Sequence, residues 1–132
     1  MVCTTSFKFI VSGLMIFLTI FSRSTIENVW WVDVCEDAAT FKQTSGTSYI
    51  IGGGAFSASD KIFQFNGRGT VNIDGFYAND YGKLIRSCGD CVNNGGPRHV
   101  IINNVQAIDG AALCGINVNY GGMSFSCNTN VR

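Results

Sequence analysis

The acidic pair Glu36–Asp37 is the first feature of this sequence that could carry chemistry. It follows the apolar residues 29–31, with a further carboxylate at Asp33, where a short strand is predicted to end. Two adjacent carboxylates repel each other unless water or a cation stabilises both charges. A hard divalent cation with oxygen ligands, calcium above all, suits such a pair. A solvated acidic turn is the alternative interpretation, and the pair alone does not decide between them.

The composition indicates which kind of fold must position this pair. The chain has 132 residues, with 16 glycines, 1 proline and only 14% charged residues. This mixture favours many short β-strands joined by tight turns over a helical bundle or a disordered chain. The formal net charge is zero, so the sequence lacks the basic character of a nucleic-acid-binding protein.

The N-terminal residues differ from the rest of the chain. Lys8 precedes an apolar run at residues 9–21, which is too short to span a bilayer comfortably. Small residues follow at Ser22 and Ser24, so residues 1–24 are predicted to be a secretory signal peptide, with a membrane anchor as the alternative. The mature domain is then expected at residues 25–132, secreted to the extracellular space and free of the membrane after cleavage.

Cysteine usage agrees with an oxidising compartment. Removing residues 1–24 leaves five cysteines, an odd number, so at least one thiol has no partner within the chain. Cys88 and Cys91 are predicted to form a disulfide across a surface turn; zinc binding would need a second ligand pair, which the sequence lacks. Whether Cys35 and Cys114 pair across the fold is left open.

A repeated strand–turn pattern suggests the architecture. Residues 70–80 align with residues 99–109, and residues 26–33 align with residues 73–80. Repeats this short cannot bury their own apolar face, so neighbouring copies must stack. The sequence therefore predicts an all-β chain, a right-handed single-stranded parallel β-helix of few coils, in preference to a β-sandwich.

Several motifs in order resemble the family 3 polysaccharide lyases, which are small secreted pectate lyases. The resemblance covers about residues 25–120 and rests on residues 28–31, 33–38, 52–55, 59–64 and 81–91. It implies a pectate-lyase-like parallel β-helix, a calcium cofactor, and cleavage of de-esterified homogalacturonan, or polygalacturonate, by β-elimination. The chain is expected to degrade plant cell-wall pectin in this way as a monomer, with polygalacturonate as its partner.

The resemblance also implies a calcium site. Glu36 and Asp37 match calcium ligands of the family, and Asp60 is placed to help hold a second ion. Family members carry additional coils before the strand at residues 28–31, including an aspartate ligand, and this stretch is expected to be missing here. A shortened relative and an incomplete chain both fit that departure.

The resemblance assigns the catalytic roles to basic residues. Lys61 matches the proposed general base, whereas Lys83 and Arg86 match residues that bind the acidic substrate. Arg86 is also expected to clamp a carboxylate during catalysis. Calcium and a second cation would lower the pKa of Lys61, which predicts an alkaline activity optimum. The single histidine, His99, is not expected to be catalytic, and one histidine without a nucleophile motif excludes a Ser-His-Asp hydrolase.

Two other functions compete with a lyase. A catalytically impaired, truncated relative would keep the basic groove and act as a pectin-binding module without the ion site. A purely structural solenoid, such as an ice-binding surface, would need regular threonine ladders on one face, and the sequence has none.

Overall fold

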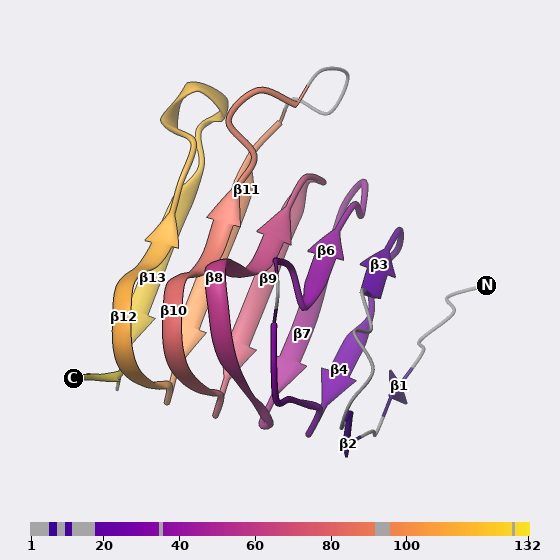
Figure 1. Ribbon diagram of the computed structural model, residues 1–132. Helices are drawn as coiled ribbons and strands as arrows, with labels where there is room; N and C mark the ends of the chain where they lie inside the picture. Colours follow the sequence, from indigo (N-terminus) through magenta and orange to yellow (C-terminus); the bar gives the residue numbers. More distant parts are fainter. Residues whose placement is uncertain (1–5, 8–9, 12–17, 35, 92–95, 128) are drawn as a thin grey trace.

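The computed structural model describes residues 6–7, 10–11, 18–34, 36–91, 96–127 and 129–132. Figure 1 shows a stack of coils in which each turn of the chain adds parallel strands to the same faces. The elements are β1 (Ser6–Phe7), β2 (Ile10–Val11), β3 (Leu18–Ile20), β4 (Thr25–Glu27), β5 (Trp30–Trp31), β6 (Ala39–Phe41), β7 (Thr47–Ile51), β8 (Gly54–Phe65), β9 (Gly69–Asp74), β10 (Tyr77–Ser87), β11 (Arg98–Asn103), β12 (Gln106–Gly115), the short 3₁₀ segment η1 (Val118–Tyr120), β13 (Met123–Cys127) and β14 (Asn130–Val131). This is the predicted right-handed single-stranded parallel β-helix.

The first sheet has the strand order β1-β4-β7-β9-β11-β13, with every described pair parallel. Its register stacks Ile26 on Ile50, Ile50 on Ile73, and Ile73 on Ile102. All four side chains are buried. The two repeats seen in the sequence therefore correspond to stacked coils, whose isoleucines lie one above another in the core.

The second sheet has the order β14-β12-β10-β8-β5-β2, and β6 joins it between β3 and β8. Its long strands β8, β10 and β12 each contain one non-glycine residue with positive φ: Ser57, Asp80 and Asp109, at 56°, 57° and 51°. The register aligns these three residues in neighbouring coils. Left-handed backbone interrupts an extended strand, so each long strand bends at this corner and covers two faces of the coil.

Aromatic side chains fill the interior beside the isoleucines. Phe63 lies edge-on to Trp31 and Phe41, with ring centroids 5.9 and 6.3 Å apart, and it also packs against Phe76 at 5.3 Å. These rings are at most 3% exposed. Burial of such large side chains supplies most of the driving force for a fold in which no single coil has a core of its own.

Strand structure begins earlier than the expected start at Thr25. Strands β1, β2 and β3 pair with β4, β5 and β6 respectively, so parts of residues 6–20 form one coil of the β-helix. Much of the predicted signal peptide lies outside the described residues, and its removal on secretion stays a prediction. In the part of the chain that the structure describes, no helix is long and apolar enough to cross a membrane.

Candidate active site

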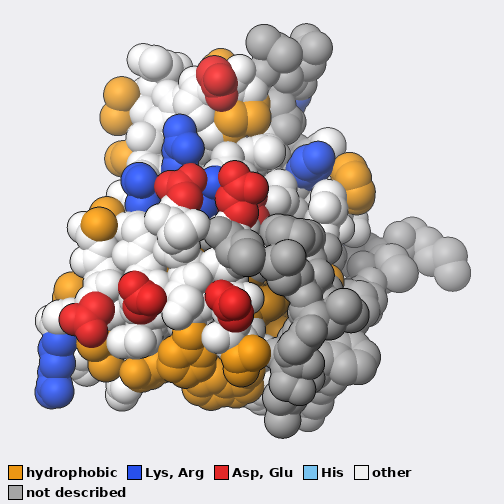
Figure 2. Space-filling model, viewed as in Figure 1, with side chains coloured by type: hydrophobic (Ala, Val, Ile, Leu, Met, Phe, Trp, Pro, Cys, Tyr) orange, Lys and Arg blue, Asp and Glu red, His pale blue; other side chains and the backbone are white. Residues whose placement is uncertain are grey.

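The charged residues singled out in the sequence lie on one lateral face, across β8, β10 and the segment before β6. The register places Lys83 beside Lys61, while Arg86 lies beside Gln64 on one side and Gly115 on the other. Asp37 precedes β6, which pairs with β8, and this brings its carboxylate to Lys61. Figure 2 shows basic and acidic side chains gathered together at the centre of this face.

A β-bulge in β8 sets the direction of two of these side chains. Ala58 pairs with Tyr81 and Lys61 pairs with Lys83, so two residues of β8 lie opposite the single residue Gly82. In a regular strand, adjacent side chains point to opposite faces, but the extra residue lets Asp60 and Lys61 contact each other. Gly82 is required at this point, because a Cβ there would lie 2.1 Å from the carbonyl oxygen of Asp60.

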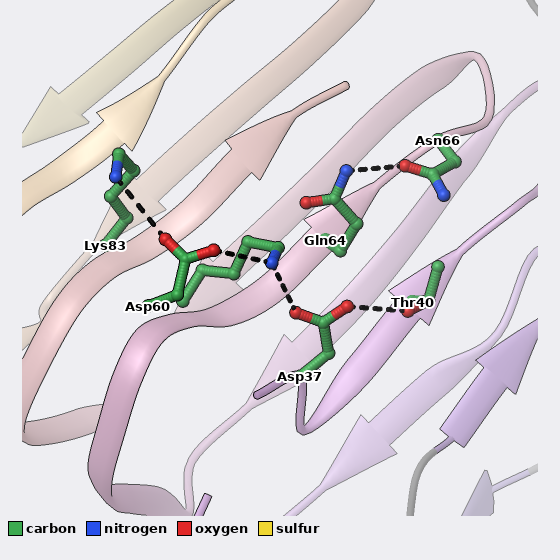
Figure 3. A network of polar contacts seen from close by, with 7 residues as sticks. Asp37, Thr40, Asp60, Gln64, Asn66 and Lys83 are labelled. Atoms are coloured by element: carbon green, nitrogen blue, oxygen red, sulfur yellow. Dashed lines mark hydrogen bonds and ion pairs between the residues drawn. The ribbon is translucent and has the colours of Figure 1, made fainter. Parts of the chain in front are cut away.

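The four charges form a chain of ion pairs that alternates in sign. Lys61 Nζ donates to Asp60 Oδ2 at 2.8 Å and lies 3.1 Å from Asp37 Oδ1. Lys83 Nζ lies 3.6 Å from Asp60 Oδ1, and Thr40 Oγ1 donates to Asp37 Oδ2 at 3.4 Å. Figure 3 shows Asp37 and Asp60 turned toward the same point, where their contacts with Lys61 meet.

Burial and charge act in opposite directions on Lys61, whose side chain is only 9% exposed. Burial lowers its pKa, but the contacts with the carboxylates of Asp60 and Asp37 outweigh that effect and raise it above the usual range. The hydrogen bond from Lys61 is in turn the main reason that the pKa of Asp60 is lowered. The expected decrease in the pKa of Lys61 depended on calcium and a second cation; among the protein's own groups, the carboxylates of Asp60 and Asp37 dominate and raise it.

An open pocket continues the charged face toward the C-terminus. Its volume is about 310 Å³, and its walls come from β10, β12 and η1. The lining residues are Lys83, Arg86, Ser87, Gly89, Gly115, Ile116, Asn117, Val118 and Asn119. The exposed side chain of Arg86 lies beside Gly115 at the edge of this space.

The side chains of this cluster offer carboxylate oxygens, which are the ligand atoms that a hard cation prefers. Asp37 and Asp60 direct carboxylate oxygens at one positive charge, the ammonium of Lys61, and Glu36 lies exposed next to Asp37. Within the described residues, however, no three acidic, histidine or cysteine side chains form a group ready to hold a metal. An ion there would draw its remaining ligands from water and from carboxylates of a bound substrate, as calcium readily does.

The other residues considered in the sequence lie away from this cluster. Cys88 and Cys91 form the predicted disulfide. Cys114 is a free thiol, and burial raises its pKa to about 11. Cys35, whose pairing the sequence left open, lies outside the described residues. His99 lies in β11, in the other sheet.

Sequence reasoning missed Arg98, a fully buried arginine next to the candidate site. Its Nε donates to Gly67 O at 2.6 Å, and its Nη atoms donate to Cys88 O at 3.2 Å and to Asn66 O at 3.3 Å. Desolvation lowers its pKa. No pattern marked it in advance, because an arginine after Pro97 at the start of a strand resembles an ordinary surface residue.

The fold and the face together define a class of protein: a parallel β-helix that presents a row of paired lysines and carboxylates on one lateral face. A family model described as pectate lyase matches residues 18–131. The chain belongs to this pectate lyase family.

Fungal relatives are more than half identical to this chain over the aligned region. Pectate lyase H of Emericella nidulans is 51% identical over 112 residues, covering 82% of this chain and 43% of the relative. A probable pectate lyase D of Aspergillus fumigatus is 53% identical over 112 residues, covering 82% of this chain and 46% of the relative. The chain therefore spans less than half the length of these curated relatives.

Solved structures agree with this membership. Pectate lyase PelI of Erwinia chrysanthemi in complex with tetragalacturonic acid superimposes with a TM-score of 0.73 at 38% identity, covering 86% of this chain and 38% of PelI. The catalytic domain of the same enzyme also gives a TM-score of 0.73, at 37% identity, covering 84% of this chain and 53% of that domain.

Proposed function

We propose that this chain carries the catalytic face of a calcium-dependent pectate lyase that cleaves de-esterified polygalacturonate by β-elimination. The observation that carries the proposal is the cluster in which Lys61 contacts Asp37 and Asp60 while Lys83 contacts Asp60. It lies on a lateral face of a β-helix of the pectate lyase family, beside the open pocket that contains Arg86.

Elimination requires removal of the proton next to the ring carboxylate, and negative charge then grows on the carboxylate oxygens. We assign proton removal to Lys61, which is the most buried amine of the cluster and lies 2.8 Å from Asp60 and 3.1 Å from Asp37. Arg86, exposed at the pocket, is placed to bind the substrate carboxylate through two parallel hydrogen bonds. Lys83 supplies a second positive charge along the same polymer.

Glu36 and Asp37 would hold calcium in this proposal, with Asp60 close to a second position. Bound there, the ion would withdraw charge from the substrate carboxylate as a Lewis acid. Binding would also require Lys61 to release Asp37, because one carboxylate oxygen cannot serve both cations at full strength. With fewer negative neighbours, Lys61 would have a lower pKa, as a general base requires.

The test uses the full chain with polygalacturonate and calcium. An elimination product is unsaturated and absorbs in the ultraviolet, so absorbance should rise with calcium and stop rising with a chelator. The variant Lys61→Met should abolish product, whereas Lys42→Met, at an exposed lysine on the neighbouring coil, should not. Product formation that is indifferent to both chelator and Lys61 would refute the assignment. Binding of polygalacturonate without product would instead support the pectin-binding module.

Secretion and a monomeric state belong to the same proposal. The Cys88–Cys91 disulfide supports an oxidising destination. N-terminal sequencing of the protein recovered from culture medium should begin near Thr25 if residues 1–24 are removed. Recovery of residues 6–20 in the secreted protein would show instead that strands β1–β3 are retained as part of the fold.

A further inference from the structure

Arg98 joins three successive turns at the end of the coils next to the pocket. Its guanidinium donates to Asn66 O and Gly67 O in the turn after β8 and to Cys88 O in the turn after β10. The ring of Tyr120, in the turn after β12, lies 5.3 Å from it. Since Arg98 is fully buried, these contacts are shielded from water, and its planar fork of donors can reach carbonyls in several directions at once.

Two of these contacts lie beside Arg86. The Cys88 carbonyl is two residues beyond Arg86, and Arg98 Nη1 also approaches Ser87 Oγ at 3.5 Å. The Cys88 amide donates to Phe65 O at 2.9 Å, so both sides of this peptide segment are fixed. The end of β10, from which the Arg86 side chain projects, therefore has little freedom to move.

The same network fixes the opposite wall of the pocket. The buried side chain of Asn117 donates to Cys88 O at 3.0 Å and to Gly89 O at 3.1 Å, and its Oδ1 accepts from the Asn119 amide at 3.1 Å. Asn117 and Asn119 line the pocket that contains Arg86. The Cys88 carbonyl is thus shared by Arg98 from one side and Asn117 from the other.

We propose that Arg98 is a positioning residue, which fixes Arg86 and the facing pocket wall at the spacing that an acidic sugar chain requires. The inference rests on the proposed function for the identity of the substrate, but the restraint itself is a property of the protein alone. Arg98 does not act on the substrate directly, since it is fully buried beneath the turns.

The test compares Arg98→Lys and Arg98→Met with Arg68→Met, which removes the same charge from an exposed position in the adjacent turn. Each Arg98 variant should lower kcat/KM on polygalacturonate by about tenfold or more, because small misplacements of a catalytic group carry large rate penalties. Arg98→Lys should lose less than Arg98→Met. Arg68→Met should stay within about twofold of the parent.

Combining Arg98→Lys with Arg86→Lys separates positioning from general stability. If Arg98 acts through Arg86, the Arg98 change should lower kcat/KM by less than about twofold in the Arg86→Lys protein. Equal losses in both backgrounds, or a loss fully explained by the unfolded fraction at the assay temperature, would overturn the proposal.

Hydrogen exchange supplies a readout that does not depend on activity. Exchange at the Cys88 and Gly121 amides, both hydrogen-bonded in these turns, should speed up about tenfold in Arg98→Lys, while amides of β9 stay unchanged. Unchanged exchange at the turns would overturn the restraint. A parent protein that neither cleaves polygalacturonate nor binds tetragalacturonate would refute the proposed function, and exchange would still decide whether Arg98 holds the turns.

Discussion

Replacing Gly82 with alanine tests whether the β-bulge really sets the geometry of the site. The new Cβ would lie 2.1 Å from Asp60 O and 3.0 Å from Asp60 C, well inside the 3.4 Å at which ordinary van der Waals contact begins. The atoms it meets belong to backbone, so no rotation of a side chain relieves the clash. The strands must either separate locally or lose the bulge.

Either response has a defined cost. Separating packed strands resembles overpacking a core, which typically costs about 1–3 kcal/mol. For a domain of this size that corresponds to a melting temperature lower by roughly 3–15 °C. Losing the bulge instead shifts the register by one residue and turns Lys61 or Asp60 to the other face. Separation of β8 from β10 weakens the 3.6 Å contact between Lys83 and Asp60, and loss of the bulge breaks the 2.8 Å contact between Lys61 and Asp60. In either case lyase activity should fall by about 100-fold or more.

Two measurements distinguish these responses. Thermal unfolding followed by circular dichroism reports the loss of stability, and Gly89→Ala is the matched control because no atom lies within 4 Å of the position its new Cβ would take. Reaction of the Lys61 amine with an acylating reagent, followed by mass spectrometry, reports whether that side chain remains 9% exposed and ion-paired. A Gly82→Ala protein that melts with the parent and labels no faster at Lys61 would refute the reasoning.

Three further predictions concern the core, the acidic cluster and the disulfide. Ile73→Ala removes a fully buried side chain from the isoleucine stack and should lower the free energy of unfolding by about 2–5 kcal/mol. Denaturant unfolding would show this as a lower midpoint. A change below about 1 kcal/mol would contradict the role of the stack in the core. Asp37→Asn should weaken calcium binding, measured by calorimetry, by roughly tenfold, whereas unchanged affinity would remove Asp37 from the ligand set. Replacing Cys88 and Cys91 together with serine should destabilise the fold by only about 2 kcal/mol, because the disulfide closes a loop of sequence separation 3; complete unfolding at room temperature would contradict that estimate.

The stacking of coils was predictable because it repeats. Ile73 and Ile102 occupy equivalent positions in two similar segments, and hydrophobic residues that recur with the same neighbours indicate stacked units whatever the length of the turns between them. Lys61 and Lys83 lie outside the aligned segments and were singled out by the family resemblance; the register then places them side by side in adjacent coils. The register of a strand is well defined when one of its faces is buried. A sequence pattern that determines which residues enter the core therefore also determines which residues lie on the opposite, exposed face.

Features that occur once were not predictable in the same way. The bulge opposite Gly82 changes the pairing by one residue, and neither the glycine nor the Ser59–Asp60 sequence distinguishes it from a regular strand. Arg98 gains its role from three carbonyls contributed by distant turns, and backbone acceptors leave no trace in the sequence. The apolar run at residues 9–21 fits a signal peptide, yet strand β3 within it pairs with β6, because both structures require apolar side chains.

The positions of Asp37, Lys61 and Lys83 show how such a face depends on local geometry more than on coil length. These residues follow one another at unequal intervals in the sequence, yet neighbouring coils place them in contact or side by side. The turn between β6 and β7 contains Gln43, which is fully buried and donates to Gly46 O and Thr70 O, so an added residue there would disturb these hydrogen bonds. An added or deleted residue between Ala58 and Lys61 would instead alter the bulge and move the ammonium away from both carboxylates. The short segment from Ala58 to Lys61, facing Gly82, is therefore where the charged face is most sensitive to change in length.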